Sequence, residues 1–130
     1  KKRPLSSMTP TLVLKDGRVV LALGSPGGPT IINTVLHVIL NVIDFGMNLQ
    51  EAVDVPRFHH QWLPDHIYWE ENGQSPDTRA ALERMGHLFR DKVGFSELPS
   101  IGDAHVVGVG ENGIRQAASD ARRGGAAAGY

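Results

Sequence analysis

The residues best suited to chemistry are the adjacent glycines Gly27 and Gly28, within the segment GSPGGPT at residues 24–30. An apolar run at 19–23 precedes the segment and a longer one at 31–43 follows it, so the glycines lie between a predicted strand and a predicted helix. Backbone N–H groups near a helix N-terminus favour negative charge. The pair can therefore hold an anion, or an oxygen that becomes negative during a reaction. The alternative is a tight turn that needs glycine only for its backbone angles.

A second candidate is the pair of hydroxyls at Ser6 and Ser7. Two adjacent hydroxyls, together with nearby N–H groups, can bind a carboxylate. A serine-stabilised turn is the alternative interpretation. Neither serine has an obvious His and Asp set nearby, which disfavours a serine triad.

Other kinds of site find little support. The glycine segment lacks the Gly-Lys-Ser/Thr ending of a phosphate loop and the spacing of a dinucleotide fingerprint. Of the six histidines, His59 and His60 are adjacent on a predicted strand and would point to opposite faces. The chain has no cysteine, which excludes thiolate metal sites and disulfides. The sequence therefore predicts no bound metal and no cofactor.

Length and charge limit the possible partners. The chain has 130 residues with a net charge of −1, from 13 basic and 14 acidic side chains. That length suits one domain or a piece of a larger one. No basic stripe with interleaved aromatics predicts nucleic-acid binding. The longest apolar run, 31–43, is too short and too polar to span a membrane.

The elements that would position these residues are hairpins and helices. Asp16-Gly17 predicts a hairpin between strands at 11–15 and 18–23, and Asn112-Gly113 predicts a second one. The other predicted strands are 58–62, 67–70, 104–109 and 114–118. Three helices are predicted. The first, at 31–43, is expected to be buried on several sides. The second is short, capped by Asn48 and Glu51 and ends at Asp54, and the third is at 77–85. Antiparallel hairpins combined with helices favour an α+β fold. Arg122 and Arg123 are expected to be a solvated pair, with which the nearby Asp120 forms a surface ion pair of little energetic value.

Several segments, read together, resemble the γ-glutamyltranspeptidase family. They are RPLSSMTPT at 3–11, GSPGG at 24–28, NVIDFGM at 41–47, EAV at 51–53, PRFHHQWLP at 56–64, ASDAR at 118–122 and the closing AGY at 128–130. Their order and spacing resemble the C-terminal part of that family's small subunit across the whole chain. One departure is Asp120-Ala121-Arg122, where the family usually has Asp-Pro-Arg, and we expect it to have little effect.

The resemblance implies part of an αββα four-layer sandwich of the N-terminal-nucleophile hydrolase type. Residues 1–130 would be the C-terminal portion of the small subunit, as a single, incomplete domain. The implied partners are the large subunit and the remaining small-subunit segment of the same precursor, and the implied location is periplasmic or secreted.

The implied activity is that of a γ-glutamyl transferase and hydrolase, acting on glutathione and other γ-glutamyl compounds through a γ-glutamyl-enzyme intermediate. The resemblance places the oxyanion hole at the backbone N–H groups of Gly27 and Gly28, and the substrate α-carboxylate at Ser6 and Ser7. The family's nucleophilic threonine lies upstream of the serine pair, so we expect it outside this chain and expect the chain alone to be inactive. The alternatives are a non-catalytic binding module of the same fold, and a related acylase or poly-γ-glutamate depolymerase.

Overall fold

The computed structural model describes residues 2–3, 8–90, 100–110 and 112–129. The chain divides into two compact units. The first unit comprises Lys1–Asp54 and Gly102–Tyr130, and the second comprises Val55–Ile101. In the described part of the chain, no helix has the length and apolar character needed to cross a membrane.

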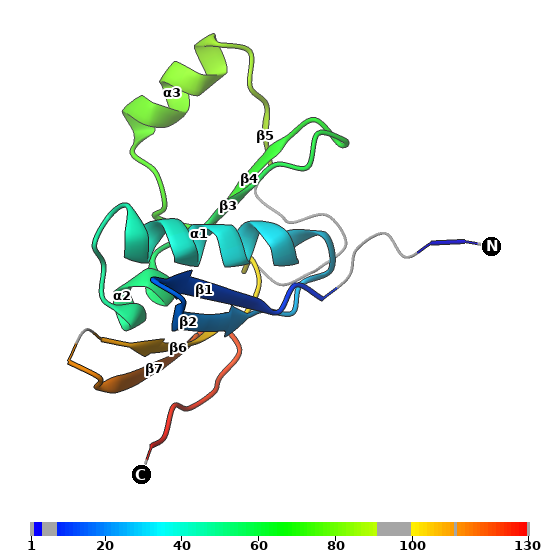
Figure 1. Cartoon of the computed structure of the whole chain (residues 1–130). Coiled ribbons are helices and arrows are strands. Elements are labelled where there is room, and N and C mark those ends of the chain that lie inside the picture. The colour runs from blue at the N-terminus through cyan, green and yellow to red at the C-terminus, as the bar shows by residue number, and fades with distance from the viewer. Residues whose placement is uncertain (1, 4–7, 91–99, 111, 130) are drawn as a thin grey trace. The chain divides into compact units, whose positions relative to one another are not determined.

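The first unit contains a four-stranded sheet in which every neighbouring pair of strands is antiparallel (Figure 1). Its order is β1-β2-β6-β7, with β1 at Thr11–Lys15, β2 at Arg18–Gly24, β6 at His105–Val109 and β7 at Arg115–Ser119. Both predicted hairpins are confirmed. In the first, Asp16 and Gly17 both adopt the positive φ angles that a two-residue hairpin turn requires, 51° and 75°.

The hairpins are joined by pairing between β2 and β6, from Leu21 opposite Gly108 to Gly24 opposite His105. This pairing brings together segments that lie about 80 positions apart in the sequence. It places the residues just before β6 beside the end of β2, where the glycine segment begins. Local sequence patterns did not predict which strands would be neighbours.

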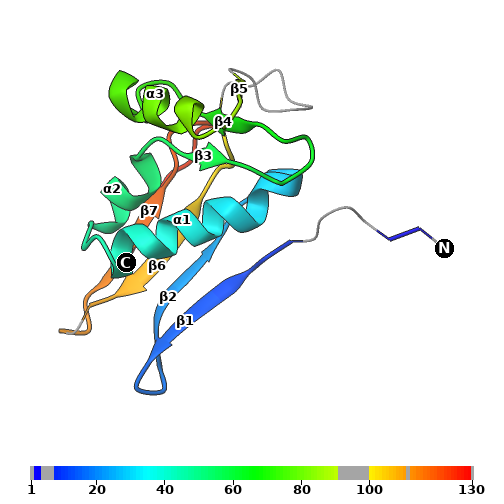
Figure 2. The same ribbon diagram turned by 90° about the horizontal axis from the view of Figure 1, so that it is seen from above.

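Two helices cover one face of this sheet (Figures 1 and 2). They are α1, at Ile31–Ile43 as predicted, and α2, at Leu49–Asp54. The buried core between the helices and the sheet consists of Leu21, Leu23, Val35, Val38, Leu49, Ala52, Val53, Ala104, Val106 and Ala118. In α1 the buried positions 31, 34, 35 and 38 form one stripe with the helical period.

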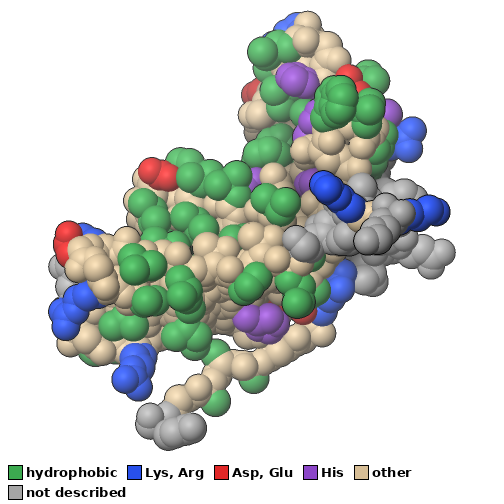
Figure 3. Space-filling view, turned by 45° about the vertical axis from the view of Figure 1, so that its right-hand side comes forward, with side chains coloured by type: hydrophobic (Ala, Val, Ile, Leu, Met, Phe, Trp, Pro, Cys, Tyr) green, Lys and Arg blue, Asp and Glu red, His purple; other side chains and the backbone are tan. Residues whose placement is uncertain are grey.

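We predicted that α1 is buried on several sides. This prediction was wrong, because among the described residues only one side of the helix is covered. Its opposite side carries Ile32, Leu36 and Ile43, whose exposures are 61%, 46% and 56%. The reason is that the sheet and α2 pack against one face of the helix only. Hydrophobic side chains consequently reach the surface of this unit, as the green patches of Figure 3 illustrate.

The sheet also has an apolar outer face. Leu12, Ala22, Val107 and Ala117 lie opposite one another in one row across all four strands. Side chains alternate between the two faces of a strand, so this row points away from the helices. Leu12 and Val107 are 61% and 48% exposed, whereas the neighbouring Val106 is buried in the core.

The predicted cap of α2 is confirmed as a reciprocal pair of hydrogen bonds. The Glu51 N–H donates to Asn48 Oδ1 at 2.9 Å, and the Asn48 N–H donates to Glu51 Oε2 at 3.0 Å. Each bond satisfies a backbone donor that the first turn of a helix leaves without an intrahelical partner.

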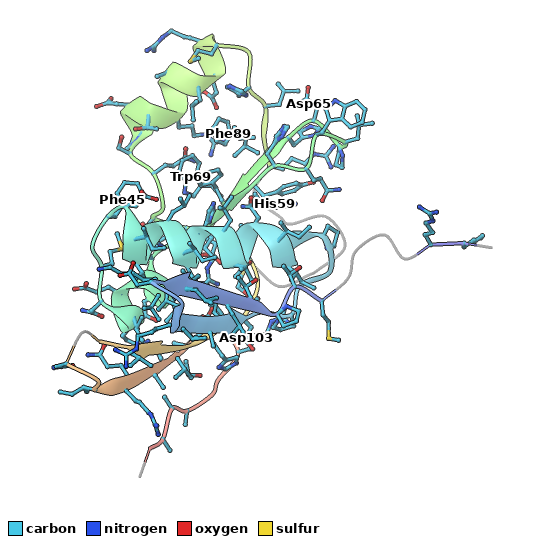
Figure 4. All side chains as sticks on the ribbon, in the orientation of Figure 1. Phe45, His59, Asp65, Trp69, Phe89 and Asp103 are labelled. Atoms are coloured by element: carbon cyan, nitrogen blue, oxygen red, sulfur yellow. The ribbon has the colours of Figure 1, made fainter. Side chains whose placement is uncertain are left out.

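The described residues of the second unit form a three-stranded sheet and one helix. The strands are β3 at Phe58–His59, β4 at Ile67–Trp69 and β5 at Phe89–Arg90, in the order β3-β4-β5, and the helix is α3 at Pro76–Arg84. The rings of Trp69 and Phe89 stack at a centroid distance of 6.5 Å, which holds β4 against β5 (Figure 4). The prediction missed β5, which is short and pairs in parallel with β4.

The predicted strand at 58–62 was too long, because the chain turns after His59. Trp62 has a φ of 71°, which is incompatible with a continuing strand. Hydrogen bonds within the turn replace the strand ladder: His60 Nε2 pairs with Asp65 Oδ1 at 3.0 Å, and Gln61 Nε2 donates to the Leu63 carbonyl at 2.9 Å.

Candidate active site

The glycine segment forms a tight corner between the end of β2 and a one-turn 3₁₀ helix at Gly28–Thr30, which runs directly into α1. Gly27 has φ 145° and Gly28 has φ 56°, both in the region that favours glycine. The predicted strand-to-helix corner is confirmed. Its backbone lies at the helix N-terminus, where the dipole favours negative charge.

The two glycines differ in what surrounds them. A Cβ added to Gly27 would lie 2.5 Å from Thr30 Oγ1 and 3.4 Å from the Gly102 Cα atom. A Cβ added to Gly28 would meet nothing within 4 Å. Among the described residues, the loop is therefore closely packed at Gly27, whereas a side chain at Gly28 would have room.

Hydroxyl groups bond to two carbonyls of this loop. The Ser25 hydroxyl donates to the Pro26 carbonyl at 2.7 Å. The Gly27 carbonyl accepts two hydrogen bonds from Thr30, one from its N–H at 3.1 Å and one from Oγ1 at 2.9 Å. These contacts fix the backbone on both sides of the Gly27 amide.

Residues from a distant part of the chain support the same loop. The Asp103 N–H donates to Ser25 Oγ at 2.9 Å, just before β6 begins (Figure 4 labels Asp103). Asp103 Oδ2 lies 3.8 Å from His105 Nε2, and Asp103 Oδ1 is enclosed without a hydrogen-bond partner among the described residues. Sequence reasoning did not single out Asp103, because its only local signal is a position between a glycine and a strand.

The structure gives different outcomes for the serine pair and the histidines that the sequence singled out. Ser6 and Ser7 lie outside the described residues, so their role as a carboxylate site stays a prediction. His59 is buried and its Nε2 pairs with Gln61 Oε1 at 3.0 Å, whereas His60 is bonded to Asp65. Among the described residues, no three His, Asp or Glu side chains come together as metal ligands do.

The predicted ion pair of Asp120 and Arg122 is confirmed, but the prediction that it lies at the surface was wrong. Asp120 is fully buried, and its Oδ1 lies 2.9 Å from Arg122 Nη1, whose side chain is 14% exposed. Asp120 Oδ2 accepts the Ala104 N–H at 2.8 Å, and Arg122 Nη1 also donates to the Val53 carbonyl at 2.7 Å. The pair therefore connects the end of β7 with α2 and the entry of β6, which sequence spacing alone does not reveal.

The whole chain, residues 1–130, matches the family model described as gamma-glutamyltranspeptidase. The chain belongs to the γ-glutamyltranspeptidase family. Among curated relatives, it is 50% identical over 121 residues to the glutathione hydrolase proenzyme of Escherichia coli, covering 93% of this chain and 20% of that protein. The chain thus spans about a fifth of the length of this relative, which is named as a precursor.

Solved structures of the family have the same fold. The T380A mutant of Helicobacter pylori γ-glutamyltranspeptidase superposes with a TM-score of 0.82 at 47% identity, over 93% of this chain and 63% of that one. The Bacillus anthracis transpeptidase CapD superposes with a TM-score of 0.78 at 25% identity, over 95% and 70%. These proteins have the N-terminal-nucleophile hydrolase fold, so the predicted α+β class and fold type are confirmed. In this chain the first unit has one helical layer, α1 and α2, on one sheet layer.

Proposed function

We propose that residues 1–130 are the C-terminal portion of the small subunit of a γ-glutamyl transferase and hydrolase that acts on glutathione and other γ-glutamyl compounds. Family membership supports the activity. The observation that carries the proposal to this chain is the loop at Gly27 and Gly28, which forms a tight, glycine-requiring corner at the N-terminus of a helix. Such a loop suits an oxyanion hole in acyl transfer.

In the proposed reaction, a threonine at the start of the small subunit, outside this chain, attacks the γ-carbonyl carbon of the substrate. Its hydroxyl proton passes to its own terminal amine as the carbon–oxygen bond forms. The carbonyl oxygen becomes negative and accepts hydrogen bonds from the N–H groups of Gly27 and Gly28. The carbon–nitrogen bond then breaks, the leaving amine takes the proton, and a γ-glutamyl ester remains on the enzyme. Water or an acceptor amine attacks this ester and regenerates the threonine.

We assign the substrate α-carboxylate to Ser6 and Ser7. Hydrogen bonds to a charged group contribute about 1.5–3 kcal/mol each. Substrate binding should therefore depend strongly on both hydroxyls, whereas the chemistry at the γ-carbonyl depends on the glycine loop.

The proposed partners are the large subunit and the remaining small-subunit segment of the same precursor. The apolar row across the outer face of the sheet, including Leu12 and Val107, supports this proposal. Apolar sheet faces of this kind pack against a second sheet in sandwich folds. A contiguous exposed apolar patch also marks a surface that another element covers.

The test compares two proteins with a chromogenic γ-glutamyl anilide as substrate. We expect turnover and γ-glutamyl-enzyme formation by the full-length polypeptide that the gene encodes, and neither by residues 1–130 alone. Turnover by the isolated chain would contradict the assignment of the nucleophile to another segment. An inactive, correctly folded full-length protein would contradict the enzymatic function and favour a binding module.

The carboxylate site is tested separately in the full-length protein. The double variant Ser6→Ala/Ser7→Ala should raise KM by about 100-fold or more, because two bonds of about 1.5–3 kcal/mol each are lost. Ser75→Ala is the matched control, because it also removes a hydroxyl but only from the cap of α3, where Ser75 Oγ accepts the Thr78 N–H at 3.2 Å. An unchanged KM in the double variant would remove the carboxylate role.

A further inference from the structure

The two amides proposed as oxyanion donors belong to peptides whose carbonyls are both bonded to hydroxyls. The Gly27 N–H belongs to the peptide whose carbonyl is that of Pro26, which accepts the Ser25 hydroxyl at 2.7 Å. The Gly28 N–H belongs to the peptide whose carbonyl is that of Gly27, which accepts the Thr30 hydroxyl at 2.9 Å. Each donor therefore has one hydroxyl on the opposite edge of its own peptide.

Peptide planarity makes this arrangement directional. In a trans peptide the C=O and the N–H point in opposite directions within one plane. A hydroxyl that holds the carbonyl therefore also sets the direction of the N–H on the other edge. The Ser25 bond turns the Gly27 N–H away from the Ser25 hydroxyl, and the Thr30 bond turns the Gly28 N–H away from the start of α1.

Further features restrict both hydroxyls. Ser25 Oγ accepts the Asp103 N–H at 2.9 Å, which connects it to the entry of β6. The Thr30 side chain is buried. Gly102 lies against Ser25, because a Cβ at that position would come within 2.8 Å of Ser25 Oγ.

We propose that Ser25 and Thr30 are positioning residues that orient the N–H groups of Gly27 and Gly28 toward the developing oxyanion. The inference rests on the proposed function of this loop. Neither hydroxyl touches the substrate, and each acts through the peptide whose carbonyl it holds. Donors that are already oriented stabilise the transition state without reorganising during the reaction, which is why their orientation affects rate more than substrate binding.

The kinetic test uses the full-length polypeptide and a γ-glutamyl anilide. Thr30→Val keeps the side-chain shape but removes the hydroxyl. We expect kcat to fall about tenfold and KM to stay within about twofold of the parent value. The expected fall in kcat is smaller than the 10²–10³-fold loss caused by removing a whole oxyanion-hole donor. Ser25→Ala should have the same signature. Thr30→Ser keeps the hydroxyl and should restore kcat to within about twofold of the parent protein.

Thr34→Val is the matched control. Thr34 lies one turn further along α1, is fully buried and donates to the Thr30 carbonyl rather than to the Gly27 carbonyl. It therefore loses a hydroxyl of the same type without releasing the loop, and we expect kcat to change by less than about twofold. Equal losses of kcat in Thr30→Val and Thr34→Val would overturn the inference, as would failure of Thr30→Ser to restore it.

Amide hydrogen exchange does not depend on catalytic turnover, so it tests this inference separately from the proposed function. In the full-length protein, Thr30→Val and Ser25→Ala should increase amide hydrogen exchange in residues 24–30 severalfold, and Thr34→Val should leave it unchanged. If the parent protein lacks γ-glutamyl turnover, the proposed function fails, and the exchange data alone then decide whether the hydroxyls order the loop. Unchanged exchange in both loop variants contradicts the positioning role whatever the activity.

Discussion

The carboxylate of Asp120 and the guanidinium of Arg122 form a 2.9 Å ion pair in which the carboxylate is fully buried. The two residues are separated by one position, yet their other hydrogen bonds reach the backbone of Ala104 and Val53. The pair thereby connects the last strand of the first unit to both a helix and a neighbouring strand. Its contribution to stability depends on keeping both partners, because removing one leaves a buried charge without its counter-ion.

Replacing Asp120 with Asn should lower the free energy of unfolding by about 3–5 kcal/mol, the range for a broken buried ion pair. Urea or thermal unfolding of the full-length protein measures the change. Glu83→Gln is the control, since Glu83 pairs with Arg79 at 3.1 Å where both side chains are about half exposed. That exposed pair should contribute no more than about 0.5 kcal/mol. Similar losses in the two variants would show that the burial of Asp120 is unimportant.

Glu70 should stabilise the second unit through its two carboxylate oxygens. Oε2 accepts the Arg57 N–H at 2.8 Å and Oε1 accepts the Ile101 N–H at 2.6 Å. Glu70→Gln replaces one acceptor with a donor, so we expect a loss of about 1.5–3 kcal/mol. Hydrogen exchange of the Arg57 and Ile101 amides checks this directly. The exposed neighbour Glu71 provides the control, and Glu71→Gln should leave both amides protected.

Gly102 and Gly113 have similar positive φ angles, 73° and 79°, but different surroundings. A Cβ at Gly113 meets nothing within 4 Å, whereas one at Gly102 overlaps Thr34 and approaches Ser25. Gly113→Ala should therefore cost only the backbone strain of about 1–2 kcal/mol. Gly102→Ala should cost more and should also lower kcat, because it displaces Ser25. Thermal unfolding and anilide turnover of both variants test this, and the idea fails if the two variants lose stability equally and keep full kcat.

The apolar outer face of the sheet should make residues 1–130 self-associate when they are produced alone. Leu12→Lys combined with Val107→Lys should reduce that association, as measured by light scattering and sedimentation, because it places two charges in the exposed row. In the full-length protein the same change should reduce the yield of the assembled enzyme, since the face would be covered there. Met85→Lys is the control, because Met85 is 74% exposed and lies outside this sheet. A full-length variant that assembles normally would argue against a buried outer face.

The elements that depend on neighbouring residues could be read from the sequence. The Asp16-Gly17 turn, the bounds of α1 and the Asn48–Glu51 cap all involve groups within four residues of one another or a local periodicity. Such features follow from backbone angles, capping bonds and the helical repeat, which act over short distances. The strand after Phe58 was predicted too long because side-chain bonds within the 60–66 turn outweigh strand propensity.

By itself, the sequence determined the family, through several motifs in a fixed order, and the strand-to-helix corner at Gly27 and Gly28. Only the tertiary structure decided that Asp103 supports this corner, that Asp120 is buried and that β2 pairs with β6. These contacts join segments up to about 80 residues apart, and no local pattern specifies which distant segments will meet. In the proposed arrangement, the orientation of the Gly27 amide also depends on them, because Ser25 accepts a hydrogen bond from Asp103, 78 residues further along the chain.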